Sequence, residues 1–72
     1  MFKIFEIKEP DGDLLGLLKT SIDEKIVQIQ LTDYWNNSES EELCIEGFID
    51  QLNNNYPEKV SERFFIDGVL TP

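Results

Sequence analysis

Few residues in this chain are suited to catalysis. Cys44 is the single cysteine, and the chain contains no histidine. Nucleophilic and acid–base catalysis usually need such a side chain beside a second group that moves its proton. Carboxylates are plentiful, but no pair of them is set apart from the other acids by its sequence context. We therefore expect a protein that is not an enzyme and has no metal site and no cofactor.

The stretch Asp11-Gly12-Asp13-Leu14-Leu15-Gly16 begins like a calcium-binding loop, with carboxylates at positions 1 and 3 and glycine at position 6. Such a loop needs further oxygen ligands, including a bidentate glutamate at position 12. Position 5 is Leu15 and position 12 is Ile22, neither of which offers a side-chain oxygen. We therefore interpret the two aspartates as turn residues.

The segment Phe65-Ile66-Asp67-Gly68-Val69-Leu70-Thr71 resembles the first motif of haloacid-dehalogenase-like phosphatases. In that family the first aspartate of the motif is the nucleophile and the second is a general acid and base. Asp67 matches the second position, but Phe65 stands where the nucleophile is needed. Because the nucleophile is missing, the resemblance does not imply phosphatase activity.

The balance of charge narrows the classes of partner. Lys and Arg number 6 against 15 Asp and Glu, which gives a net charge of −9. Phosphate binding relies on Lys and Arg contacts, and an anionic membrane surface repels an acidic chain. We therefore expect no direct binding of nucleic acid or membrane. The alternation of charged and apolar residues in MFKIFEIKEP is unlike a signal peptide or membrane anchor, so a cytoplasmic location is predicted.

Chain length predicts one domain that covers residues 1–72. A chain of 72 residues is near the lower limit at which one hydrophobic core stabilises a fold without disulfides, metal or a partner chain. Association of two copies into a homodimer is therefore left open.

The clearest predicted helix is Ser40 to Tyr56. Its apolar residues recur every three or four positions and so share one sector of a helix. These residues are Cys44, Ile45, Phe48, Ile49, Leu52 and Tyr56. A buried thiol is predicted for Cys44 from its place in this sector. Gly47 indicates either a close approach by another backbone or no structural role.

The ends of this helix are also marked in the sequence. Ser38 or Ser40 is suited to cap the first turn, because a serine hydroxyl accepts from free backbone N–H groups. The three asparagines at 53–55 tolerate a left-handed cap, and Pro57 disfavours helical geometry in the residue before it. We therefore expect the helix to stop near Asn54.

Two strands and a turn are predicted at the start of the chain. Phe2 to Lys8 is apolar on both sides, as is typical of an inner strand. Glu9-Pro10-Asp11-Gly12 is a strong turn sequence. Asp13 to Ile22 would also fit a short helix, but the turn before it, Gly16 and the β-branched residues near its end favour a strand.

Two more strands are predicted on either side of the helix. Ile26 to Thr32 alternates apolar and polar residues, which predicts a strand with one wet face after a turn at residues 23–25. Asp33 to Glu39 is predicted to be a loop. Val60 to Asp67 is predicted to be a largely buried strand at an edge of the sheet or beside the first strand. The expected fold is α+β with the order β-β-β-α-β, an antiparallel meander with one amphipathic helix across one face.

A long acidic stretch holds the candidate binding residues. Between Ile26 and Glu58 there is no Lys or Arg but there are seven acids. Such a surface either keeps a small protein soluble or attracts a basic partner. Two aromatic residues lie just before the helix, where they could anchor an interface or cap the core. The candidate partner-binding residues are Tyr34, Trp35, Glu42, Glu46 and Asp50.

Two functions fit these features. The leading hypothesis is a small, non-catalytic protein-interaction module of a regulatory or adaptor type, whose partner is another protein with a basic surface. The alternative is a DNA-mimic inhibitor of a nucleic-acid-binding protein, as mobile elements encode. Glu42, Glu46 and Asp50 would rise one helical turn each, about 6 Å apart, which is close to the spacing of phosphates along a strand.

Overall fold

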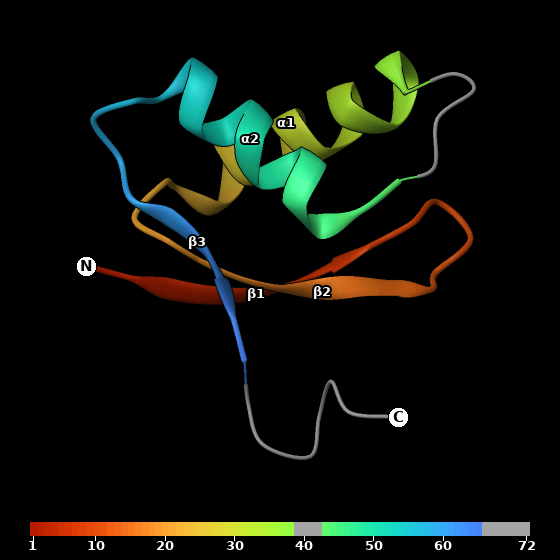
Figure 1. Cartoon of the computed structure of the whole chain (residues 1–72), viewed down its shortest axis with the longest axis horizontal. Helices are drawn as coiled ribbons and strands as arrows, with labels where there is room; N and C mark the ends of the chain where they lie inside the picture. The colour runs from red at the N-terminus through yellow and green to blue at the C-terminus, as the bar shows by residue number, and fades with distance from the viewer. Residues whose placement is uncertain (39–42, 66–72) are drawn as a thin grey trace.

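The computed structural model describes residues 1–38 and 43–65. Its elements are β1 (Lys3–Lys8), β2 (Leu14–Thr20), α1 (Glu24–Asn37), α2 (Ile45–Asn55) and β3 (Ser61–Phe64). The strands form one antiparallel sheet in the order β1-β2-β3, and both helices cover the same face of it (Figure 1). The α+β class is confirmed, but the order is β-β-α-α-β, so the predicted third strand and single helix are wrong.

The first two strands and their turn are confirmed. The Gly12 N–H donates to the Glu9 carbonyl at 2.9 Å, and the Asp13 N–H donates to the Asp11 carboxylate at 3.1 Å. Gly12 has a φ of 99°, which favours glycine at this position. The residues after the turn form β2, so the alternative of a short helix there is wrong.

The segment predicted as a third strand and residues 33–37 of the predicted loop lie in α1 instead, and Glu39 lies outside the described residues. Asp23, which was expected in a turn, is the N-cap residue, and its carboxylate accepts from the Lys25 N–H at 3.2 Å. Val27, Leu31 and Trp35 follow one another at four-residue spacing, and all three are at least partly buried. Ile29 fits only the alternating pattern, and it is 64% exposed. The four-residue spacing of apolar side chains therefore continues to Trp35, whereas the alternation of apolar and polar residues ends at Thr32.

The apolar stripe predicted for the second helix is confirmed in α2. Ile45, Phe48, Ile49 and Leu52 are buried, and they join the core formed with β1, β2 and α1. The helix ends at Asn55, close to the predicted end. None of the described non-glycine residues has a positive φ, so the expected left-handed cap is absent there. Tyr56 caps the helix instead, with its N–H donated to the Leu52 carbonyl at 2.8 Å.

The start of α2 differs from the prediction. The helix begins at Ile45, and its N-cap residue is Cys44, whose Sγ accepts from the Gly47 N–H at 3.3 Å. The predicted burial of Cys44 is therefore wrong: the residue is exposed, because it precedes the helix and has extended backbone. Ser38 caps the end of α1, and Ser40 lies outside the described residues.

Both outer strands differ in part from their predictions. β1 lies at an edge, so it is not the inner strand that its apolar composition suggested. β3 lies at the opposite edge beside β2, as one of the two predictions for the last strand stated, and a buried hydrogen bond of 2.8 Å joins the Thr20 and Ser61 hydroxyls there. Phe65 follows β3 and is 64% exposed, so the strand is not largely buried. Residues 66 and 67 of the predicted strand lie outside the described residues.

A close contact seats α2 on the sheet. Gly16 of β2 faces Ile45, and a Cβ atom added to Gly16 would lie 3.0 Å from the Ile45 Cβ and within 3.2 Å of both of its γ carbons. A side chain at this position would therefore press on Ile45, so glycine favours the close approach of the strand and the helix at that point. Neither helix of the described chain has the length and apolar character needed to cross a membrane.

We expect Gly16→Ala to destabilise the fold. Overpacking against Ile45 costs about 1–3 kcal/mol, which exceeds the roughly 0.5–1 kcal/mol that alanine gains over glycine inside a strand. Urea unfolding measures the difference. In an Ile45→Ala background the two γ carbons are absent and only the Cβ contact remains, so the same change should cost less than it does in the wild-type protein. Equal costs in both backgrounds would show that this contact does not seat α2.

Candidate protein-interaction surface

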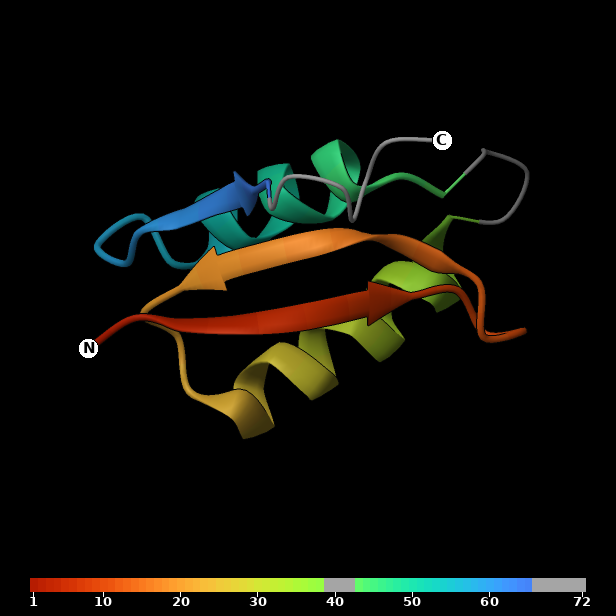
Figure 2. The same cartoon turned by 90° about the horizontal axis from the view of Figure 1, so that it is seen from below.

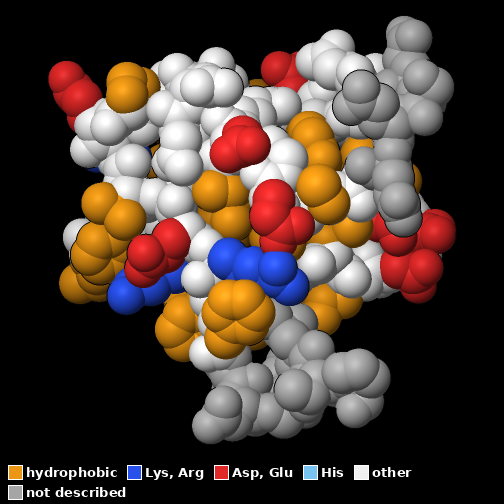
Figure 3. Space-filling view, viewed as in Figure 1, with side chains coloured by type: hydrophobic (Ala, Val, Ile, Leu, Met, Phe, Trp, Pro, Cys, Tyr) orange, Lys and Arg blue, Asp and Glu red, His pale blue; other side chains and the backbone are white. Residues whose placement is uncertain are grey.

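The acidic face of α2 is exposed, but it is not free of basic groups. Glu46 and Asp50 both lie on the outer side of the helix, and Glu42 lies outside the described residues. The Glu46 carboxylate accepts a hydrogen bond from the Arg63 guanidinium of β3 and forms an ion pair with it. Asp50 forms no salt bridge with any residue in the described part of the chain. Figure 3 shows acidic side chains over α2 beside the basic side chains near β3.

Charge is divided unequally between the sheet and the rest of the molecule. Four of the six basic residues lie on strands, namely Lys3, Lys8, Lys19 and Arg63, whereas only two of the described acids do, namely Glu6 and Glu62. The other described acids lie on the helices and in the connections between elements. The strands are therefore the basic part of an acidic protein. The helices carry Glu24, Asp33, Glu46 and Asp50, and three further acids lie in the turn between β1 and β2.

Tyr34 connects the two helices. The residue lies in α1 and is partly buried, so its predicted place in a loop is wrong. Its hydroxyl donates to the Cys44 carbonyl at 3.1 Å and accepts from the Cys44 N–H at 3.2 Å. Its ring lies 5.7 Å from that of Phe48, centroid to centroid. Tyr34 therefore holds the start of α2 against α1.

Trp35 connects α1 to the sheet. Its indole N–H donates to the Lys8 carbonyl at the end of β1, at 3.0 Å, and the residue is partly buried. The two adjacent aromatic residues thus contact different elements, since Tyr34 contacts the start of α2 and Trp35 the end of β1. No hydrogen bond or ring contact found among the described residues joins Trp35 to Glu46 or Asp50. Trp35 is therefore not linked directly to the two described acids of α2.

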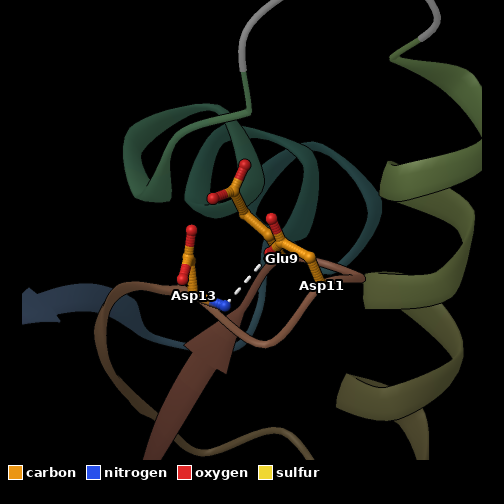
Figure 4. A group of neighbouring side chains, drawn as sticks. All are labelled: Glu9, Asp11 and Asp13. Atoms are coloured by element: carbon orange, nitrogen blue, oxygen red, sulfur yellow. Dashed lines mark hydrogen bonds between the residues drawn. The ribbon is translucent and has the colours of Figure 1, made fainter.

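Three carboxylates gather in the turn between β1 and β2. Oxygens of Glu9, Asp11 and Asp13 lie within 4.8 Å of one another (Figure 4). Carboxylate oxygens are ligands for hard divalent cations. Here the turn itself explains the arrangement, because one Asp11 oxygen accepts from the Asp13 N–H. The turn role predicted for Asp11 and Asp13 is confirmed.

Several residues that shape this surface were missed in the sequence. Arg63 is 17 positions from Glu46, so no local pattern indicates that they pair. Gln51 donates to the carbonyl and side-chain oxygens of Gln30 at 2.9 and 3.0 Å, and Asn55 donates to the same side chain at 2.8 Å. These hydrogen bonds join α2 to α1 through polar side chains outside the hydrophobic core.

Gly47 has a close neighbour, but that neighbour is a side chain and not another backbone. A Cβ atom added at Gly47 would collide with the Tyr34 hydroxyl and lie 3.2 Å from the ring carbon that carries it. A glycine in the first turn of an otherwise well-formed helix is the only signal of this contact in the sequence.

Comparison of the chain with protein-family models, with curated proteins and with solved structures finds no significant match.

We expect the effect of Gly47→Ala on stability to depend on Tyr34. Alanine is favoured over glycine in a helix by up to about 1 kcal/mol, but here it displaces the hydroxyl that makes two hydrogen bonds, each worth about 1 kcal/mol. Gly47→Ala should therefore destabilise the wild-type protein and become neutral or stabilising in a Tyr34→Phe background. Thermal or urea unfolding of the four proteins measures this coupling. An identical change in both backgrounds would contradict the contact.

Proposed function

We propose that this protein is a small, non-catalytic interaction module of a regulatory or adaptor type that binds a basic surface of another protein through its acidic helical side. The distribution of charge supports this proposal, because both described acids of α2 are exposed on its outer side, whereas most basic residues lie on the strands. A surface of one sign speeds association with a partner of the opposite sign and repels others.

Each candidate residue has a defined part in this proposal. Asp50 offers an exposed carboxylate without a described salt bridge. Glu46 can exchange Arg63 for a basic residue of the partner, since the Glu46 side chain is 58% exposed and the ion pair is open to solvent. Tyr34 fixes the start of α2, and the accessible part of Trp35 adds an aromatic contact. Glu42 belongs to the same acidic series by its sequence spacing.

A DNA mimic remains the second candidate. The favourable observation is that Glu46 and Asp50 are both exposed on the same helix, one turn apart. Arg63 argues against mimicry, because its positive charge lies directly beside Glu46 and interrupts a line of negative groups. An interaction module is therefore the function that we favour.

Charge reversal at Asp50 tests the proposal. Partners are captured by the tagged protein from its native cell extract at low salt, and the affinity of each purified partner is then measured. We expect Asp50→Lys to weaken binding about tenfold, because an attractive contact becomes repulsive. Asp13→Lys is the matched control, since it makes the same change in net charge at an exposed residue between β1 and β2, outside the acidic stretch. Equal affinities for the two variants would contradict a role for the acidic face of α2.

The salt dependence of the same binding separates the two functions. At a chosen 0.5 M salt the Debye length is about 4 Å, so a purely ionic contact is strongly screened, whereas apolar burial is not. Retention of a partner through such a wash is expected of an interaction module. Release of a nucleic-acid enzyme by the wash would favour the DNA mimic.

A further inference from the structure

The outer edge of β1 presents backbone groups that β2 does not use. The Lys8 carbonyl accepts from Trp35 of α1, so it points away from β2. Backbone groups alternate in direction along a strand, which turns the N–H and C=O groups of Ile4 and Glu6 to the same outer side. The Glu9 N–H fits this alternation, because it donates to Asp13 on the β2 side. In the described part of the chain, β1 pairs with β2 alone.

A groove runs beside this edge. Figure 2 shows α1 alongside β1, beyond the edge of the sheet. The groove between them has a volume of about 200 Å³. It is lined by Phe5, Glu6, Ile7, Glu24, Val27, Gln28, Leu31, Thr32 and Trp35. Trp35 also bonds to the end of β1, so the groove offers apolar side chains next to unused backbone donors and acceptors.

The charges of the lining indicate what kind of strand fits. The lining contains two carboxylates and no Lys or Arg. Glu6 forms a solvent-exposed ion pair with Lys8 at 3.8 Å, whereas Glu24 forms no salt bridge with any described residue. The whole chain carries a net charge of −9, so a second copy would bring the same acidic charge to the edge. Lys3 and Lys8 stand at the two ends of β1, where they limit the open part to the residues between them. The groove therefore suits a short extended segment with basic residues.

We propose that the edge of β1 accepts an added β-strand from a basic, extended segment of another protein. The segment pairs with the backbone groups of Ile4 and Glu6, and one of its apolar side chains occupies the groove between β1 and α1. In this mode of recognition the backbone bonds supply affinity and alternate side chains supply specificity. This surface is separate from the acidic face of α2, so the inference does not rest on the proposed function.

Peptide selection on the full-length protein tests this inference. The probe is a display library of random twelve-residue peptides, selected at low salt, from which the best binder is synthesised. We expect enriched peptides that alternate apolar with Lys or Arg residues. We also expect the synthetic peptide to shift the backbone amide NMR signals of Ile4 and Glu6 more than those of α2.

Proline at an outward-facing position provides the decisive variant. Glu6→Pro removes an N–H that β2 does not use, so the sheet is retained while the added strand loses a donor. We expect at least about a tenfold loss of peptide affinity in Glu6→Pro, corresponding to one hydrogen bond and the steric block. Glu6→Ala, which keeps the N–H, is the matched control and should lose less than about threefold, the effect of a surface charge. Ile4→Pro repeats the test if Glu6→Pro does not fold.

A second pair of variants tests the groove. Gln28→Trp fills it, whereas Ile29→Trp adds the same ring at an exposed position outside its lining. Only Gln28→Trp should weaken the peptide. The inference is overturned if no peptide is enriched, if the proline variants bind as tightly as the wild-type protein, or if Asp50→Lys abolishes binding while Glu6→Pro does not. A dimer that dissociates on Glu6→Pro would also overturn it, because the occupant would then be a second copy.

Discussion

The close approach of α2 to the centre of the sheet determines the rest of this structure. Gly16 leaves room for Ile45, and Phe48 and Leu52 of the same helix are fully buried. Because α2 lies on β2, the chain after it reaches the sheet as β3, where Arg63 meets Glu46. The first helix must then take the remaining space beyond α2 and beside β1.

This arrangement explains why α1 is held by particular bonds more than by broad packing. Val27 is the one buried residue of α1, whereas α2 has four buried residues. Tyr34 reaches the start of α2, Gln30 receives bonds from Gln51, and Trp35 reaches the end of β1. A helix fixed in this way leaves a groove next to the first strand. The position of α1 therefore leaves the outer edge of β1 without a pairing strand among the described residues.

The parts of the fold that could be predicted from the sequence are those with a local signal. The hairpin follows from turn chemistry at residues 9–12, and the buried face of α2 follows from its apolar spacing. The segment Ile26 to Thr32 was mistaken for a strand because Ile29 completes an alternation within seven residues. Helical spacing becomes visible only when the aromatic residues at 34 and 35 are included.

The candidate site was less predictable, because its geometry depends on contacts between distant segments. Tyr34 and Trp35 were placed together as loop anchors, yet each is bonded to a different element. Glu46 was assigned to an uninterrupted acidic series, but Arg63 from the last strand lies beside it. Cys44 precedes the helix and is exposed, although its spacing places it in the apolar sector. The spacing of apolar residues predicts which face of a helix is buried, but it does not show which distant segment contacts each face.

Amide hydrogen exchange along β1, followed by NMR in dilute protein, tests this account most directly. If β1 is an edge strand and α1 lies alongside it without pairing, the amides of Phe5 and Ile7, which point to β2, exchange slowly. Those of Ile4 and Glu6, which point outward, exchange quickly. Slow exchange at all four positions would contradict the account, because it would mean that another strand covers the outer edge of β1.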